Sequence, residues 1–225
     1  VHSIDAMTNL SKKFRQELKE VSTISSLHPL LVEEARDGTK KFLFQLEDGN
    51  HIESVLISDK SRLTLCISTQ VGCALGCQFC LTGKKGWKRN LMVSEILNQI
   101  LAVRETLKDG SSITNVVLMG MGEPLANYDN TLKAIELMVH PEAFKLSSRR
   151  ITLSTAGLLP ELERLSKEKI SFSLAISLNA SDEETRSHLM PVNRRYPLER
   201  LLEACRHFPL RPRTRITFEY VLVGG

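Results

Sequence analysis

Two kinds of hydrophobic periodicity occupy the first 60 residues of the chain. Apolar residues three or four positions apart predict a short amphipathic helix near the N-terminus; they are Leu10, Phe14, Leu18 and Val21. Downstream, apolar and polar residues alternate on both sides of Asp48-Gly49, a dipeptide that favours a tight turn. The pattern therefore predicts a β-hairpin, with one strand around 42–46 and the other over 52–57.

From about residue 63 onward, short strand patterns alternate with amphipathic helix patterns. Alternating units of this kind predict an α/β fold with a parallel sheet, which is either open or closed into a barrel. Strands are expected over 63–68, 115–120, 150–155, 171–178 and 215–223. Helices are expected near 94–107, 129–139, 160–167, 182–189 and 198–208.

Four of these strands place apolar residues on one face and small or polar residues on the other. In the fourth strand, for example, Ser173 and Ser177 alternate with Leu174 and Ile176. A parallel sheet that is covered on both faces is usually apolar throughout. We therefore expect the polar face to line a barrel that holds a ligand and the apolar face to pack against outer helices; a sheet with one wet face is the alternative. In the last strand the apolar face consists of Ile216, Phe218, Tyr220 and Leu222.

Composition indicates an ordinary globular protein, and charge adds one feature. Hydrophobic residues make up 42% of the chain, and no apolar run approaches the roughly 18 residues that span a bilayer. The N-terminus lacks a signal-peptide pattern, so we expect a cytoplasmic protein without a membrane partner. The net charge is only +4, but the basic residues cluster, which suits a nucleic-acid backbone as well as plain surface solvation. One cluster consists of Lys84, Lys85, Lys88 and Arg89.

Three of the five cysteines lie within eight residues, just after the first expected barrel strand. Cys73, Cys77 and Cys80 form a C-x₃-C-x₂-C pattern, which is too tight for an ordinary disulfide framework and favours metal in a cytosolic chain. Three thiolates can hold three irons of a [4Fe–4S] cluster and leave the fourth iron open. The amino and carboxylate groups of S-adenosylmethionine (SAM) can occupy that iron. A structural zinc site is the alternative, but zinc takes four protein ligands and no fourth Cys or His follows nearby.

Candidate SAM-binding residues follow the next three strands, at the ends where barrels place their sites. A Gly-Glu-Pro segment ends the second strand, and a glycine there lets the backbone approach a ligand. Hydroxyl and amide side chains at the third and fourth strands can reach the ribose and carboxylate of SAM. A plain turn, and small residues that fill the barrel, are the alternatives. The candidates are Gly122, Glu123, Ser154, Ser177, Leu178 and Asn179.

Five segments of the chain carry a recognisable family pattern. The most specific are Cys-Ile-Ser-Thr-Gln-Val-Gly-Cys at 66–73 and Met-Gly-Met-Gly-Glu-Pro-Leu at 119–125. The others are Gly-Trp-Lys-Arg-Asn-Leu at 86–91, Arg-Ile-Thr-Leu-Ser-Thr at 150–155 and Leu-Ala-Ile-Ser-Leu at 174–178. Together they resemble the RlmN/Cfr family of radical SAM RNA adenine methyltransferases, over nearly the whole chain.

The resemblance implies a partial (β/α)₆ radical SAM barrel preceded by a short helix and a β-hairpin. It divides the chain into a remnant of an N-terminal accessory helical domain (1–25), a β-hairpin extension (26–60) and a barrel with strands one to five (61–225). The sixth strand and the C-terminal segment of the family are expected to be absent.

The resemblance also implies a reaction, namely methylation of adenine C2 in 23S rRNA and in tRNA. Methylation at C8 is an alternative that no residue here decides. The implied cofactors are a [4Fe–4S] cluster and SAM, the electron donor is flavodoxin-like or another one-electron carrier, and the protein is a monomer. Glu53 matches the proton acceptor of the family, although an exposed hairpin carboxylate is the alternative. Cys66 matches the second cysteine, which forms a disulfide with a methyl-carrying cysteine as product leaves.

The chain departs from the family pattern at three points. Asn179 stands where a histidine is expected, and most of the N-terminal accessory domain is missing. The methyl-carrying cysteine, expected after the sixth strand, is missing as well. Cys205 does not replace it, because it shares the apolar face of an expected helix with Leu201 and is expected to be a buried, inert thiol. A third hypothesis is therefore an inactive fragment that binds the cluster and RNA.

Overall fold

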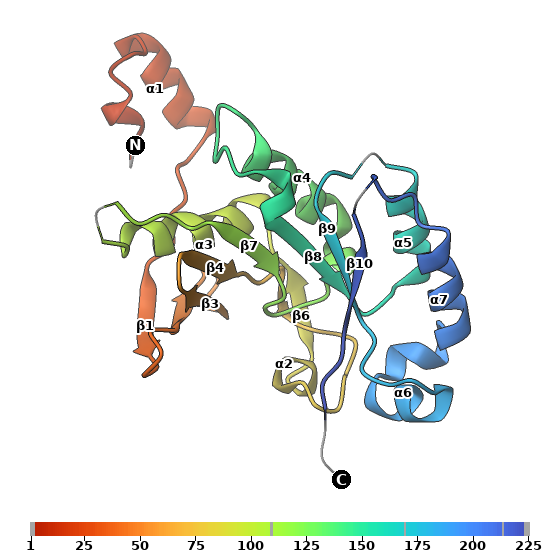
Figure 1. Cartoon of the computed structure of the whole chain (residues 1–225). Helices are drawn as coiled ribbons and strands as arrows, with labels where there is room; N and C mark the ends of the chain where they lie inside the picture. The colour runs from red at the N-terminus through yellow and green to blue at the C-terminus, as the bar shows by residue number, and fades with distance from the viewer. Residues whose placement is uncertain (1–2, 109, 169, 213, 223–225) are drawn as a thin grey trace.

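The computed structural model describes residues 3–108, 110–168, 170–212 and 214–222. Within them, one eight-stranded sheet runs through the molecule, antiparallel on one side and parallel on the other (Figure 1). In order across the sheet the strands are β1 (Pro29–Glu34), β2 (Lys40–Gln45), β3 (His51–Asp59), β4 (Arg62–Cys66), β7 (Asn115–Leu118), β8 (Ile151–Thr155), β9 (Ser173–Ser177) and β10 (Ile216–Glu219).

The antiparallel side of the sheet is a three-stranded meander, one strand more than the sequence predicts. The expected hairpin forms as β2 and β3, with Gly49 of its turn at a φ of +79° and the rings of Phe42 and Phe44 fully buried. β1 pairs with β2, and β3 pairs with β4, so the meander continues into the parallel sheet. Periodicity missed β1 because its apolar residues are consecutive and exposed; they are Leu30, Leu31 and Val32.

The parallel side of the sheet confirms the predicted α/β fold. Strands β4, β7, β8, β9 and β10 are parallel neighbours in that order. Their apolar faces bury residues such as Leu65, Leu153 and Ile176 in one core with the helices, as predicted. The main helices on this side are α3 (Val93–Glu105), α4 (Tyr128–Val139), α5 (Leu159–Ser166), α6 (Glu183–Leu189) and α7 (Leu198–Arg206).

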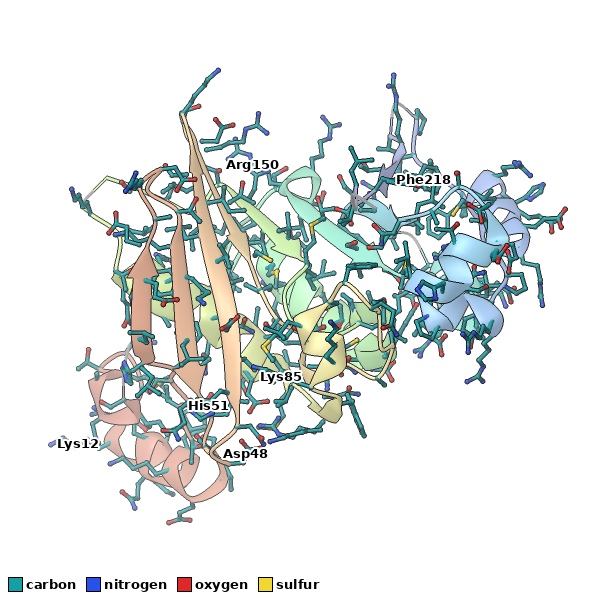
Figure 2. All side chains as sticks on the ribbon, turned by 90° about the horizontal axis from the view of Figure 1, so that it is seen from below. Lys12, Asp48, His51, Lys85, Arg150 and Phe218 are labelled. Atoms are coloured by element: carbon teal, nitrogen blue, oxygen red, sulfur yellow. The ribbon has the colours of Figure 1, made fainter. Side chains whose placement is uncertain are left out.

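The outer end of β10 departs from the expected pattern. Ile216 packs against the core, but Phe218 is 45% exposed and Leu222 is 89% exposed. Figure 2 labels Phe218 at the edge of the sheet. α7 packs against α5 instead of covering this face, so the expected burial of the whole apolar face is wrong. Val223, the end of the predicted strand, lies outside the described residues.

The expected N-terminal helix forms as α1 (Lys12–Val21), but it buries none of its residues. Phe14 and Val21, which the spacing places on its apolar face, are both exposed. Asp5 pairs with Lys19 at 2.7 Å, so the contacts of α1 include an ion pair to the turn that precedes it. No helix within the described ranges is long and apolar enough to cross a membrane.

A small second sheet is inserted between β4 and α3. It pairs β5 (Gln70–Gly72) with β6 (Trp87–Asn90), and the short helix α2 (Leu81–Lys84) lies between them. In Figure 1 this insertion lies at the lower edge of the molecule, which is also where α6 lies. The insertion carries the three clustered cysteines.

Candidate functional site

The cysteine loop is closed at its base by the β5–β6 hairpin. The Cys73 amide donates to the Gly86 carbonyl at 3.1 Å. Gly72 is required at this point, because its φ is +76° and a side chain would collide with the same carbonyl. The loop that follows therefore starts from a fixed position beside the end of β4.

The three thiols of the loop lie near one another and are partly buried. Burial, followed by the Cys73 and Cys80 thiols, raises the pKa of Cys77 to about 12. Burial also raises the pKa of Cys73, with a contribution from Cys80. Among the residues that the structure describes, no group of three His, Cys, Asp or Glu side chains is placed to hold a metal ion. A [4Fe–4S] cluster takes one thiolate on each iron, so its cysteines stand farther apart than the ligands of one ion, and three neighbouring thiols suit it.

The cysteine loop packs against the segment that follows β9. Leu75 and Cys77 contact a small apolar cluster formed by Ala156, Met190 and Val192. The Gln78 amide donates to the Leu189 carbonyl at the end of α6 at 2.8 Å. These contacts hold the loop against the residue that follows β8 and against the segment after α6; Ser154, a predicted SAM-binding residue, lies in β8.

Gly122 follows β7, and the structure gives a different reason for glycine there than a ligand's approach. Its φ is +99°, which favours glycine. A Cβ at this position would lie 2.5 Å from the Cβ of Gln70, a residue of β5. The space beside Gly122 is thus filled by Gln70, so the expectation that the missing side chain leaves room for a ligand is wrong in its reasoning.

Glu123 ties its own loop to the end of β8. One carboxylate oxygen accepts from the Leu125 amide at 3.0 Å and the other from the Ala156 amide at 2.8 Å. Its own amide donates to the Gln70 side chain at 2.8 Å. Burial raises the pKa of this carboxyl, and the hydrogen bond from the Ala156 amide opposes that rise. Glu123 therefore joins the cysteine-loop hairpin, its own loop and β8.

Ser154 and Ser177 come together around a residue that sequence reasoning did not assign. Their hydroxyl oxygens are 3.3 Å apart, and both contact Oε2 of Glu219, at 2.6 Å for Ser154 and 3.4 Å for Ser177. Glu219 lies at the end of β10, and its carbonyl also accepts from the Leu178 amide at 2.9 Å. The only sequence signal for Glu219 was its place on the polar face of the last strand.

Asn179 is buried and holds a left-handed backbone conformation with a φ of +59°, which asparagine tolerates better than most residues. Its side-chain oxygen accepts from the Val221 amide at 3.0 Å, and its nitrogen lies 3.3 Å from the Met190 sulfur. The side chain therefore contacts both the segment after β10 and Met190, a member of the apolar cluster against which Cys77 packs.

Cys66 and Glu53 lie on one face of neighbouring strands. Cys66 is opposite Val55 in the β3–β4 pairing, and Glu53 is two residues from Val55, so both side chains point to the same side. Burial raises the pKa of the Cys66 thiol to about 11. The Glu53 carboxylate is 46% exposed and lies 3.8 Å from the Lys41 ammonium.

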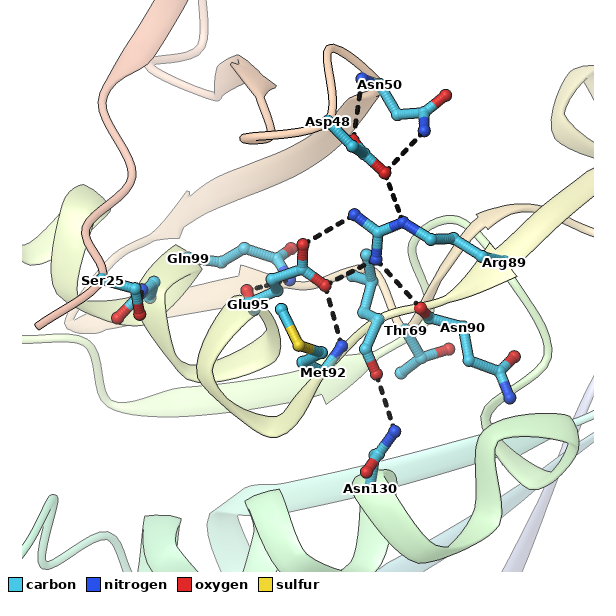
Figure 3. A network of polar contacts seen from close by, with 12 residues as sticks. Ser25, Asp48, Asn50, Thr69, Arg89, Asn90, Met92, Glu95, Gln99 and Asn130 are labelled. Atoms are coloured by element: carbon cyan, nitrogen blue, oxygen red, sulfur yellow. Dashed lines mark hydrogen bonds and ion pairs between the residues drawn. The ribbon is translucent and has the colours of Figure 1, made fainter. Parts of the chain in front are cut away.

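The basic cluster divides into exposed lysines and one engaged arginine. Lys84 and Lys85 are exposed, and Figure 2 labels Lys85 on the same side of the molecule as the hairpin tip at Asp48. Arg89 instead forms ion pairs with Asp48 and Glu95 (Figure 3). The expectation that all four basic residues face a phosphate backbone is therefore wrong for Arg89, whose charge already has two partners.

The remaining thiol, Cys205, is buried on α7, as predicted, and burial raises its pKa to about 11. All five cysteines of the chain are free thiols in this structure. The disulfide implied for Cys66 needs a partner cysteine that the described chain does not supply.

The chain resembles known proteins both in sequence and in structure. Residues 67–225 match the model of the Radical SAM superfamily. The chain is 56% identical over 223 residues to "Dual-specificity RNA methyltransferase RlmN" of Pelobacter propionicus, covering 99% of this chain and 63% of the relative. The protein of the same name from Geobacter sulfurreducens is 52% identical, with coverages of 99% and 61%. The chain thus spans about three fifths of the length of the curated relatives it matches.

A solved structure has the same fold. The crystal structure of a radical SAM methyltransferase from Sphaerobacter thermophilus superposes with a TM-score of 0.91 at 43% sequence identity. The match covers 100% of this chain and 67% of that chain.

Proposed function

The chain belongs to the radical SAM superfamily and, within it, to the RlmN/Cfr family, and from this we propose that it serves in methylating adenine C2 in 23S rRNA and tRNA. The proposal concerns the activity of the whole protein, and it is based on relatives that are longer than this chain. Methylation at C8, and an inactive unit that binds only the cluster and RNA, are the outcomes that the experiment below separates.

One observation carries the proposal: the cysteine loop and the predicted SAM-binding segments meet at one edge of the sheet. Ala156, at the end of β8, contacts the Cys77 side of the loop and donates its amide to Glu123. Ser154 and Ser177 approach each other within the same region, one at β8 and one at β9. The carboxyl ends of parallel strands are where α/β barrels place their chemistry.

We assign the cofactors to two sets of residues. Cys73, Cys77 and Cys80 would hold a [4Fe–4S] cluster, which supplies the electron that cleaves SAM when both are bound. The raised pKa of Cys77 means that its thiol loses a proton when iron binds. The residues that would bind and orient SAM are Gly122, Glu123, Ser154, Ser177, Leu178 and Asn179.

Glu53 and Cys66, on the neighbouring strands β3 and β4, are the proposed proton-transfer residues. With a pKa of about 11, Cys66 stays a neutral thiol at physiological pH, so its proton must be removed before its sulfur can form a disulfide. Glu53 is partly exposed, so a proton that its carboxylate accepts can pass on to water. A flavodoxin-like protein or another one-electron carrier would reduce the cluster.

RNA would approach over the cysteine loop. Lys84 and Lys85 are exposed beside it, and Trp87 is 51% exposed on β6. Lysines that bind phosphates release the counterions of the RNA, which favours binding. An exposed indole offers a surface on which a base can stack. Lys88 is also exposed, although its ammonium donates to Asn50 at 3.0 Å.

Mass spectrometry of RNA from cells with and without the gene tests the proposed function. We expect 2-methyladenosine in 23S rRNA and tRNA to disappear when the gene is deleted and to return with the gene, but not with a Cys77→Ala version. Loss of 8-methyladenosine instead would move the site to C8. Unchanged RNA in the deletion strain would contradict a methyltransferase function and favour a unit that only binds.

A further inference from the structure

Arg186, on α6, is the largest fully buried side chain of the described residues. It joins the segment after α6, against which the cysteine loop packs, to the ends of two strands. Nη2 donates to the Ala156 carbonyl at 2.9 Å, and Nε donates to the Leu178 carbonyl at 3.1 Å. Nη1 donates to the Asn193 side chain at 2.5 Å. One guanidinium thus joins the ends of β8 and β9 to the turn that packs against Cys77.

The charge of Arg186 has no ion-pair partner among the described residues. Two carboxylates, Glu183 and Glu184, lie on the same helix, and the oxygens of Glu183 accept from the Asn193 side chain at 2.7 Å and the Leu198 amide at 2.9 Å. Fully buried charges are rare unless they are paired or lie beside a metal centre. The hydrogen-bond partners of Arg186 are neutral carbonyl and amide oxygens, so its positive charge is compensated only through space, by Glu183 beyond Asn193.

This buried charge lies near a proposed cluster ligand. Ala156, whose carbonyl accepts from Arg186, belongs to the apolar group against which Cys77 packs. Burial lowers the pKa of Arg186, and negative charge at Glu183 and at Cys77 opposes that shift, so the guanidinium lies within electrostatic reach of the Cys77 sulfur. Each thiolate that binds iron adds one negative charge there, and a buried cation at this position would compensate it.

We propose that Arg186 is a positioning residue whose buried positive charge compensates the cluster at Cys77 and raises its reduction potential. The proposal rests on the proposed function, since it requires the cluster. Reduction adds one electron to the oxidised [4Fe–4S]²⁺ core and gives [4Fe–4S]⁺, so the reduced state carries one more negative charge. A nearby cation favours that state, because cluster potentials follow net charge and surroundings.

The test compares three variants of the full chain after anaerobic reconstitution with iron and sulfide. Arg186→Met removes the charge and nearly keeps the length, Arg186→Lys keeps the charge, and Arg194→Met removes an exposed charge from the same region as a control. Potentiometric titration with dithionite and mediator dyes, read by electron paramagnetic resonance, gives the midpoint potential. Thermal unfolding reports the structural contribution separately.

In Arg186→Met we expect the equilibrium constant for one-electron reduction to fall at least tenfold, which is 59 mV. Arg186→Lys should stay within about threefold of wild type although it unfolds at a lower temperature, and the control should not change. If Arg186→Met fails to fold, Arg186→Gln removes the charge but keeps a hydrogen-bond donor, and it should lower the potential in the same direction.

A cluster-loaded Arg186→Met or Arg186→Gln with the wild-type potential would overturn the proposal and leave the proposed function intact. Equal potential losses in Arg186→Lys and Arg186→Met would likewise overturn it, because geometry rather than charge would then be responsible. Failure of the wild-type chain to take up any cluster would refute both this inference and the proposed cofactor.

Discussion

Replacing Arg89 by methionine should destabilise the fold rather than weaken RNA binding. The guanidinium forms a forked pair with Glu95, with Nη1–Oε2 at 2.8 Å and Nη2–Oε1 at 2.7 Å, and its Nε donates to Asp48. Glu95 lies on α3 and Asp48 in the β2–β3 turn, so one side chain of β6 joins three elements (Figure 3). Because the Glu95 side chain is only 10% exposed, loss of Arg89 leaves a nearly buried carboxylate without its cation.

The size of the effect follows from this burial. Removing one partner of a buried ion pair costs about 3–5 kcal/mol. Arg89 is 31% exposed, and the Met92 amide still donates to Glu95 at 2.8 Å, so part of that cost is offset. We expect the free energy of unfolding to fall by about 2–3 kcal/mol, which is about 4–12 °C in melting temperature for a domain of this size.

Urea unfolding followed by circular dichroism measures this loss. Lys88→Met is the matched control, because Lys88 is exposed with one hydrogen bond to Asn50, and it should cost no more than about 0.5 kcal/mol. The hydrogen bond from Arg89 lowers the pKa of Asp48 in the folded state. That stabilisation is present above the unfolded pKa and is lost as pH falls through the folded one, so the gap between wild type and variant should be full at neutral pH and shrink below about pH 4. Equal stability at neutral pH, with weaker RNA binding instead, would refute the reasoning.

Four further measurements address the proposed site. Alanine at Cys73, Cys77 or Cys80 should abolish iron and sulfide uptake while alanine at Cys66 or Cys205 should not, and an iron-replete Cys77→Ala protein would contradict the assignment. Cluster assembly should accelerate as pH rises from about 7 to about 9, since the pKa of Cys77 is raised to about 12; a rate independent of pH would argue against thiol deprotonation as the slow step. Gly122→Val should lower SAM affinity at least tenfold by displacing the loop from Gln70, with equilibrium dialysis as the readout, and unchanged affinity would sink that placement. Changing Lys84, Lys85 and Lys88 to glutamine should reduce the slope of log affinity for RNA against log salt by about 2–3, and an unaltered slope would remove these lysines from the interface.

Sequence periodicity predicted the parallel half of the sheet well because its signals are local. Apolar residues such as Leu153 and Ile176 alternate with small ones, and β7, β8 and β9 are each followed by a helix. The pattern failed where burial does not follow alternation. The apolar run of β1 stays exposed at one edge of the sheet, and Phe218 stays exposed at the other. Edge strands lack a neighbour on one side, so their side chains are less constrained.

Long-range pairing accounts for Glu219, which sequence reasoning missed, and for Arg89, whose role it misassigned. Glu219 meets Ser154 across 65 positions of the chain, and Arg89 meets Asp48 across 41. Neither contact leaves a mark in local spacing, and a basic run reads the same whether its charges face solvent or a carboxylate. By contrast, Cys73, Cys77 and Cys80 could be recognised because three ligands within one loop show a characteristic spacing in the sequence.

The family motif around the cysteines consists largely of residues that hold the loop, which explains why it is more specific than the ligands alone. Gln70 donates to Asn90 of β6 at 2.7 Å and accepts from the Glu123 amide at 2.8 Å, so it joins the hairpin to the Gly-Glu-Pro loop. The Ser68 hydroxyl accepts from the Met121 amide at 2.9 Å, and it donates to the Glu53 carbonyl at 2.6 Å. A chain with only three spaced cysteines could bind iron in many folds, whereas these contacts demand that the cysteine loop, the proposed proton acceptor and the proposed SAM loop be neighbours. The resemblance therefore carries geometric information that the metal-ligand spacing by itself does not contain.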